Sequence, residues 1–250
     1  MREKRWRYYD VTVNGLPQRI RYSEATVDGL FLPLLRRLAE MQRQAGRRIL
    51  VFLAAPPATG KSTLLLFLAQ LARKHDERTR IQSLGMDGFH YPNSCLEMYT
   101  TLRDGVEIPL KSIKGAPETF DVAALAAALA AAKAGRTQFP VYDRRIHDVV
   151  PDALTVDADI LLVEGNWLLL DEDPWRELTA LADYTVRIDA QPALLRDRLI
   201  ARKVQGGLSE AEARAFYAAS DAPNVARFAA HMGRADEVWQ MEPDGDFVRA

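Results

Sequence analysis

The sequence has little cysteine, no long hydrophobic run and almost no net charge. Its single cysteine, Cys95, excludes an internal disulfide bond and a cysteine-based zinc site, and its four histidines are not spaced like metal ligands. No apolar stretch approaches membrane-spanning length, and no apolar core follows the basic residues at the N-terminus, as it would in a signal peptide. We therefore expect a cytoplasmic protein without a membrane partner.

The balance of charge also limits the partners. The chain has 33 basic and 34 acidic residues, so no field of one sign favours nucleic acid. Its 250 residues contain no linker-like stretch, and a chain of this length can bury one good core. We expect a single domain over residues 1–250, and the sequence leaves open whether it forms a homodimer.

One segment has the pattern of a phosphate-binding loop. It lies between the apolar run 49–54, which predicts a strand, and the run 64–72, which favours a helix. In such a loop the backbone N–H groups surround a polyphosphate, and the following helix directs its positive N-terminal end at the same charge. The candidate nucleotide-binding residues are Ala55, Pro56, Pro57, Ala58, Thr59, Gly60, Lys61, Ser62 and Thr63.

Two side chains of this loop carry chemistry. Lys61 is placed to reach the β- and γ-phosphates of ATP, and the Ser62 hydroxyl is placed to ligate Mg²⁺. Ala55 stands at the first position of the motif, where glycine is usual. This change is tolerable if Ala55 keeps a negative φ, because the tight turn then falls on Gly60 alone. The predicted cofactors are ATP and Mg²⁺.

The rest of the pattern predicts an α/β fold. Apolar runs at 49–54, 81–86, 160–163, 184–188 and 238–241 alternate with helical or loop stretches. This alternation implies a five-stranded parallel sheet with helices on both of its faces. Together with the phosphate-binding loop, it predicts the P-loop NTPase fold.

Three further segments have recognisable patterns. An Asn-Gly pair between β-type runs, followed by leucines at helical spacing, predicts an N-terminal hairpin and helix within residues 1–46. Residues 91–117 contain three prolines and two glycines and predict a long loop that covers the substrate. Asp121 and Gly135 are placed to begin and end an alanine-rich helix at 122–134.

Acidic residues follow two of the predicted strands. Ligands bind at the carboxyl ends of parallel strands, so both acids are candidates for catalysis. Asp87 is the candidate general base for an acceptor hydroxyl, with His90 on the acceptor side, and the alternative is a turn or cap aspartate. Glu164 is the candidate that organises Mg²⁺, and the alternative is a surface acid. Gly165 favours the first interpretation because glycine permits close backbone approach.

A pair of arginines is also a candidate. Arg198 and Arg202 are four residues apart on a helix that begins near Pro192, so both can point the same way. They suit a lid that contacts the transferring phosphoryl group, and a solvated helix surface is an equally good interpretation.

Five segments, in order, resemble the phosphoribulokinase and uridine kinase group of P-loop kinases, which has bacterial pantothenate kinase as a near relative. They are APPATGKST, MDGFH, KGAPETFD (114–121), PVYDRRIHD (140–148) and LLVEGNWLLLD (161–171), spread over about half of the chain. The nearest branch is the one labelled fructose transport system kinase or nucleoside kinase-like. In combination these motifs are highly specific.

The resemblance implies roles for individual residues. It implies that Asp87 is the general base and that Arg198 and Arg202 are the lid arginines, in a lid region at 192–224. Asn224 lies in a segment similar to one in the transport-kinase branch and is expected to approach the nucleotide.

The acceptor site is implied in the same way. The Tyr-x4-His arrangement with which uridine kinases hold the acceptor falls on Tyr142 and His147, in a hairpin arm at 138–156. The intervening position that is aromatic in uridine kinases is Arg144 here, and Arg145 follows it. An acidic or polyhydroxylated acceptor suits two arginines better than a stacked base does, unless both arginines line the surface of the arm.

The sequence thus predicts an enzyme that transfers the γ-phosphate of ATP to a hydroxyl of a sugar, a nucleoside or a pantothenate-like compound. Two alternatives stay open: a nucleotide-dependent regulatory or binding protein, and a nucleoside monophosphate kinase. The four asparagines do not supply the Asn-Lys-x-Asp signature of a GTPase switch. A phosphate acceptor needs no catalytic base, so Asp87 beside His90 argues against a monophosphate kinase.

Overall fold

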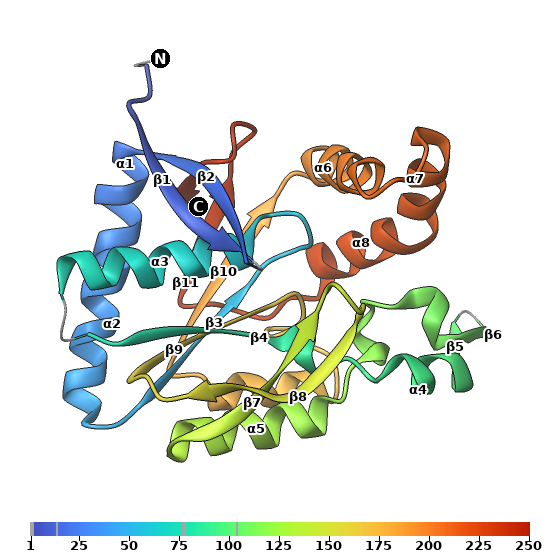
Figure 1. The fold of residues 1–250 in the computed structure, drawn as a ribbon, viewed down its shortest axis with the longest axis horizontal. Helices are drawn as coiled ribbons and strands as arrows, with labels where there is room; N and C mark the ends of the chain where they lie inside the picture. Colours follow the sequence, from blue (N-terminus) through green and yellow to red (C-terminus); the bar gives the residue numbers. More distant parts are fainter. Residues whose placement is uncertain (1–2, 14, 77–78, 104) are drawn as a thin grey trace.

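The computed structural model of the protein describes residues 3–13, 15–76, 79–103 and 105–250. Its centre is a six-stranded sheet with the order β12-β11-β10-β3-β9-β4 (Figure 1). The parallel strands are β3 (Ile49–Ala54), β4 (Ile81–Gly85), β9 (Ile160–Gly165), β10 (Tyr184–Ala190) and β11 (Glu237–Met241). The predicted five-stranded parallel sheet is confirmed, and an antiparallel edge strand, β12 (Phe247–Arg249), extends it.

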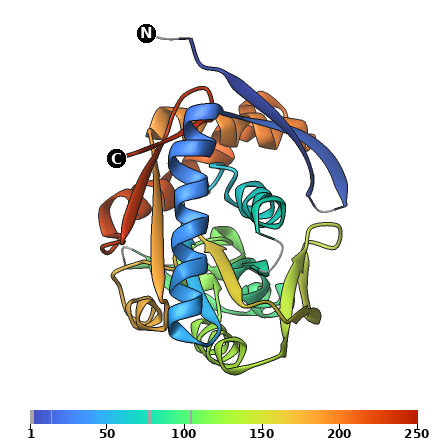
Figure 2. The ribbon, with the colours of Figure 1, turned by 90° about the vertical axis from the view of Figure 1, so that its left-hand side faces the viewer.

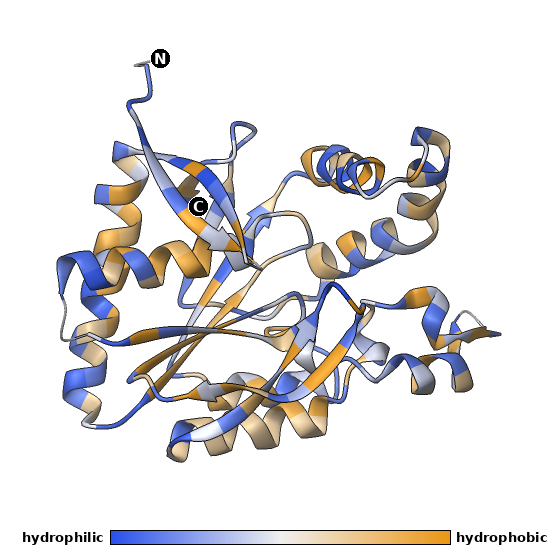
Figure 3. Cartoon of the chain, viewed as in Figure 1, coloured by the Kyte–Doolittle hydropathy of each residue, from blue (hydrophilic) through white to orange (hydrophobic). Residues whose placement is uncertain are grey.

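The central strand explains why helices cover both faces of the sheet. All six residues of β3 are apolar and buried, and successive side chains of a strand point to opposite faces. Val51 packs in a core with α2 (Leu32–Ala45) and α3 (Lys61–His75), whereas Phe52 packs in a second core with α5 (Val122–Ala134). Strands that are apolar on both faces are typical of parallel sheets between helical layers, and Figure 3 shows these strands as predominantly hydrophobic.

Helices also follow β10, beside the phosphate loop (Figure 1). They are α6 (Pro192–Gln205), α7 (Glu210–Phe216), η6 (Tyr217–Asp221) and α8 (Ala222–His231). Leu195 and Leu199 of α6 pack with Val225 of α8, and Ala58 of the phosphate loop packs against this cluster. In the part of the chain that the structure describes, no helix combines the length and apolar character needed to cross a membrane.

Two predicted hairpins are present. The N-terminal one pairs β1 (Trp6–Val13) with β2 (Leu16–Ser23), and α1 (Glu24–Thr26), η1 (Val27–Phe31) and α2 follow it. The predicted Asn-Gly turn includes Asn14, which lies outside the described residues. The arm pairs β7 (Thr137–Asp143) with β8 (Asp148–Val156).

The prediction of a long loop at 91–117 is wrong. The segment contains α4 (Asn93–Met98), a third hairpin of β5 (Thr100–Arg103) and β6 (Val106–Pro109), and the 3-10 turns η3 (Leu110–Ile113) and η4 (Pro117–Thr119). Its prolines and glycines lie at the borders of these elements rather than in an irregular chain. Pro92 precedes α4, Gly105 takes a φ of 78° between β5 and β6, and Pro109 ends β6.

Candidate active site

The loop that follows β3 contains two residues with left-handed backbone. Gly60 has a φ of 81° and Ala58 a φ of 67°, whereas the buried Ala55 is not among the residues with positive φ. Alanine at position 55 is therefore unstrained, as expected. The expectation that the turn falls on Gly60 alone is wrong, because Ala58 shares it, and a non-glycine residue holds this conformation only where its surroundings fix it. Thr59 contributes to that, since its hydroxyl donates a hydrogen bond of 2.9 Å to the Pro56 carbonyl.

The start of α3 and the end of β9 bring three side chains together. Because β9 pairs with β3 in parallel register, Glu164 lies beside the loop that follows β3. The Ser62 hydroxyl donates a hydrogen bond of 2.5 Å to Glu164 Oε1, and Lys61 Nζ lies 4.0 Å from Glu164 Oε2. Burial raises the pKa of Glu164, and the Lys61 charge opposes that shift.

The oxygen donors at this point fit Mg²⁺. Hydroxyl and carboxylate oxygens are the hard ligands that this ion prefers, and it takes few of them beside water and phosphate oxygens. Ser62 Oγ and Glu164 Oε1 touch, so both face the same spot next to the loop. Gly165 has a packing role instead, because a Cβ there would lie 2.1 Å from Met86 Sδ.

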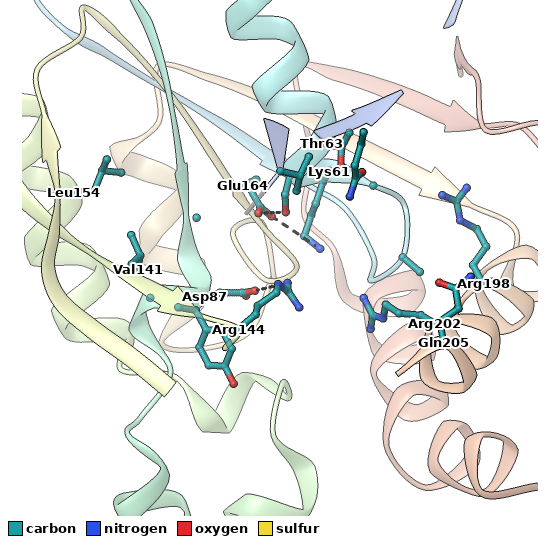
Figure 4. Close-up of a pocket in the computed structure, with 18 of the residues that line it drawn as sticks. Lys61, Thr63, Asp87, Val141, Arg144, Leu154, Glu164, Arg198, Arg202 and Gln205 are labelled. Atoms are coloured by element: carbon teal, nitrogen blue, oxygen red, sulfur yellow. Dashed lines mark hydrogen bonds and ion pairs between the residues drawn. The ribbon is translucent and has the colours of Figure 1, made fainter. Parts of the chain in front are cut away.

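Asp87 enters the same cavity from the neighbouring strand. It lies in η2 (Met86–Phe89), which continues β4, and β4 pairs with β9. Gly88 lets the arm pack directly on η2, because a Cβ at Gly88 would lie only 2.4 Å from the Pro140 carbonyl oxygen. Through this contact Arg144 reaches the site, with its Nη2 3.7 Å from Asp87 Oδ2 (Figure 4). Asp87 thus lines the cavity beside a cation.

The two adjacent arginines of the arm face different surroundings. Arg144 lines the cavity and contacts Asp87. The Arg145 side chain is 89% exposed and pairs with Asp143 at 2.6 Å. The sequence left the position of both residues open, and the structure places Arg144 alone of the two in the cavity.

Of the other residues predicted to bind the acceptor, one lines the cavity and two do not. Tyr142 lines the cavity. His147 is exposed in the turn between β7 and β8. His90 packs on Phe120 with 3.9 Å between ring centroids, and its Nδ1 lies 2.9 Å from the Asp87 carbonyl oxygen. The structure does not bring either histidine to the cavity lining, and His90 instead supports the backbone that carries Asp87.

Both predicted lid arginines line the cavity from α6. Arg202 points across the cavity toward Lys61 and Arg144 (Figure 4). Arg198 is partly buried, with Nη1 3.9 Å from Met241 Sδ, and burial lowers its pKa. Among the described residues, neither arginine has a carboxylate within ion-pair distance. Arg202 is therefore placed to face an anion in the cavity, whereas the Arg198 guanidinium lies against Met241.

Asn224 lies on α8, outside the lining of the cavity. It is 6% exposed. Its side-chain Oδ1 accepts no hydrogen bond within the described part of the chain. The neighbouring Val225 packs on α6, so this segment supports the helix that carries the two arginines.

One cavity of about 730 Å³ is lined by Lys61, Ser62, Asp87, Tyr142, Arg144, Glu164, Arg198 and Arg202. The lining also includes residues that sequence analysis missed: Val13 and Gln18 of the N-terminal hairpin, and Val141 and Leu154 of the arm. Nothing in the sequence distinguishes them, because they are ordinary strand residues. Only the packing of two hairpins against the sheet brings them to the site.

Comparison with known proteins gives relatives along the whole chain. The protein "Uncharacterized protein YggC" of Escherichia coli (strain K12) is 44% identical over 239 residues, which are 95% of this chain and 97% of that protein. The crystal structure of a "putative fructose transport system kinase" from Silicibacter sp. TM1040 is 32% identical, with a TM-score of 0.75 over 84% of this chain and 98% of that one. No protein-family model matches the chain.

Relatives with a stated activity also match. A pantothenate kinase of Sodalis glossinidius is 31% identical over 80% of this chain and 69% of its own length. The chain spans between 50% and 69% of the length of the pantothenate kinases that it matches. Together with the loop, the strand order and the acids at the strand ends, these relatives show that the chain belongs to the P-loop kinases of the phosphoribulokinase and uridine kinase group.

Proposed function

We propose that this kinase transfers the γ-phosphate of ATP to a hydroxyl group of a small metabolite. The observation that carries the proposal is the position of Asp87, which lines the same cavity as Lys61, Ser62 and Glu164. Transfer to a hydroxyl needs a carboxylate that can accept the proton of the acceptor, next to the groups that hold the phosphates.

The loop side of the cavity would hold the nucleotide. Backbone N–H groups of residues 58–63, which follow the two prolines of the loop, would surround the phosphates, and Lys61 would contact the β- and γ-phosphates. Ser62 and Glu164 would hold Mg²⁺. When bound, this ion neutralises charge that develops on the phosphate oxygens.

The other side would hold the acceptor. Asp87 takes the hydroxyl proton as the oxygen forms its bond to the γ-phosphorus, and the bond between that phosphorus and the bridging oxygen breaks to release ADP. Arg144 and Tyr142 contact the acceptor. Arg202 and Arg198 neutralise the transferring group, and the region 192–224 acts as a lid that excludes water.

Names of relatives suggest which acceptors to test. Similar proteins are named for pantothenate, uridine and a fructose transport system. A polar or acidic group of the acceptor would suit Arg144, the one arginine of the arm in the cavity. The acceptor is accordingly a sugar, a nucleoside or a pantothenate-like compound.

The test is a search for the phosphorylated product. The pure protein is incubated with Mg²⁺, labelled ATP and a metabolite extract, and new phosphorylated species are identified by mass spectrometry. We expect one phosphate ester of an alcohol, which a Lys61→Ala control does not make. A product phosphorylated on an existing phosphate would instead favour a nucleoside monophosphate kinase. The absence of any phosphorylated product would favour a regulatory protein.

A further inference from the structure

The N-terminal hairpin has one face that turns toward the body of the protein. Its register pairs Val13 with Leu16, Val11 with Gln18 and Tyr9 with Ile20. Directly paired residues of an antiparallel hairpin share a face, and successive residues alternate. These six side chains therefore lie on one face, which we call the inner face, and the neighbouring Thr12 lies on the other.

The root of the inner face is fixed to the body of the protein. Val11 is 5% exposed, and the Tyr9 ring lies 4.5 Å from the Phe67 ring of α3, measured between centroids. Before the hairpin, Lys4 pairs with Glu242 and, at 2.7 Å, with Asp244, next to the edge strand β12. These contacts hold the hairpin on α3, the helix that begins with Lys61.

The tip of the inner face continues over the cavity. Val13 and Gln18 are among the cavity-lining residues. Leu16, paired with Val13 on the same face, is 66% exposed. Figure 2 shows this tip projecting over the same side of the molecule as the arm β7–β8. The arm contributes the apolar Val141 and Leu154 to the same cavity.

Val13, Gln18, Val141 and Leu154, which we call the uncharged wall, differ in chemistry from the residues of the phosphate side. The residues contributed by the hairpin tip and by these two arm positions carry no charge, and the one polar group among them is the amide of Gln18. Apolar side chains gain nothing from contact with phosphates, which the cations Lys61, Arg198 and Arg202 of the same cavity would attract instead. The wall therefore suits the uncharged part of an organic molecule.

We infer that the tip of hairpin β1–β2 is part of the acceptor site, with Val13, Leu16 and Gln18 as specificity-determining residues. The inference rests on the proposed kinase function. The acceptor it fits is an alcohol that carries an aliphatic portion near the reacting hydroxyl, which Val13 and Leu16 cover and Gln18 orients by one hydrogen bond. A free sugar, with hydroxyls on most of its carbons, would leave polar groups unpaired against this wall.

The test compares inner-face and outer-face variants. Val13→Ala, Leu16→Ala and the control Thr12→Ala are assayed with three alcohols: D-pantothenate, uridine and D-fructose. D-Pantothenate bears a dimethyl carbon next to its primary hydroxyl, and we expect it to have the highest kcat/KM of the three. Val13→Ala should raise the KM of the alcohol about tenfold, as expected for the loss of about two buried methyl groups, with the KM of ATP unchanged. Leu16→Ala should act in the same direction, and Thr12→Ala should change neither KM.

The outcomes distinguish a failure of the acceptor-site inference from a failure of the proposed kinase function. If an alcohol is phosphorylated and both inner-face variants keep its wild-type KM, the hairpin is not part of the acceptor site, while the kinase function stands. A rise in the KM of ATP alone would assign the hairpin to the nucleotide and also overturn the inference. Preference for D-fructose would overturn the assigned substrate class. Phosphorylation of none of the three alcohols, and of no alcohol in the metabolite extract, would overturn the proposed function itself. Circular dichroism melting of each variant separates these effects from unfolding.

Discussion

On the phosphate side of the cavity, Glu164 contacts both Lys61 and Ser62, and the Lys61 and Glu164 side chains are 14% and 11% exposed. On the acceptor side, the Arg144 and Asp87 side chains are 55% and 38% exposed and lie 3.7 Å apart. The first group comes from one loop and one adjacent strand of the central sheet. The second comes from a strand end and a hairpin arm.

This difference separates two tasks. The phosphate side is held rigidly by the sheet, so it is organised before any ligand binds. The acceptor side combines a strand end with a hairpin arm, and the tip of the arm can change without disturbing the sheet. We infer that the phosphate side fixes the reaction type and the acceptor side fixes the substrate. The following predictions test that division, from the largest expected effect to the smallest.

The largest effect is expected where the two sides meet. Arg202 faces the cavity without a carboxylate partner among the described residues, so Arg202→Ala should lower kcat by about three orders of magnitude or more, with little change in ATP affinity. Arg196→Ala is the matched control, because Arg196 lies on the same helix and pairs with Asp197 at 2.9 Å. Steady-state rates and calorimetric ATP binding measure both. Equal rates in the two variants would show that Arg202 has no catalytic role and is an ordinary residue of the helix surface.

The next effect separates binding from chemistry. Asp87→Asn should keep calorimetric ATP affinity near the wild-type value and lower kcat by about two to four orders of magnitude, the usual contribution of a positioned general base. Lys61→Ala should weaken both ATP affinity and kcat, because it removes a charge from the phosphates. Near-normal turnover in Asp87→Asn would exclude Asp87 as the base.

A smaller effect should divide the two arginines of the arm. Arg144→Ala removes the cation beside Asp87 and should raise the KM of the acceptor by about thirtyfold, the value of one charge-assisted hydrogen bond of about 2 kcal/mol. Arg145→Ala should leave that KM unchanged, since Arg145 is exposed and pairs with Asp143. The acceptor is the alcohol found in the extract experiment. The same KM in both variants would remove Arg144 from the acceptor site.

The smallest effect concerns stability rather than catalysis. Burial lowers the pKa of His90, the charges of Lys114 and Arg144 act in the same direction, and the charge of Asp87 opposes them. The unfolded chain has the ordinary histidine pKa of about 6.5 and binds a proton more readily. The free energy of unfolding contributed by His90 is therefore complete above pH 6.5 and is lost as the pH falls below it.

Urea unfolding measures this effect. The free energy of unfolding is determined at pH 7.5 and pH 5.5 for the wild type and for His90→Gln, which does not titrate. The decrease on acidification should be smaller in the variant. The same decrease in both proteins would show that His90 does not couple folding to pH.

The sequence predicted the positions of the loop residues well because the pattern that places them is local. A strand, a loop of nine residues and a helix start are contiguous in the chain, so the positions of Lys61 and Ser62 follow from one motif. Asp87 and Glu164 could be added because parallel strands end at one edge of a sheet, whatever their order. Proline and glycine were misleading at 91–117, where they border short elements that packing stabilises.

The acceptor side needed the tertiary structure. Neighbours in sequence such as Arg144 and Arg145 separate because the turn of the arm directs one toward Asp87 and the other toward solvent. Val13 is an ordinary strand residue by its sequence. It lines the cavity because the hairpin packs on α3, which brings it to a loop more than 40 residues later in the chain. The sequence by itself determined the fold and the positions of the loop and of the strand-end acids, because those depend on contiguous motifs and on strand ends that must converge. Only the tertiary structure decided which side chains of the hairpins enter the cavity, because hairpin orientation depends on long-range packing that no local pattern encodes.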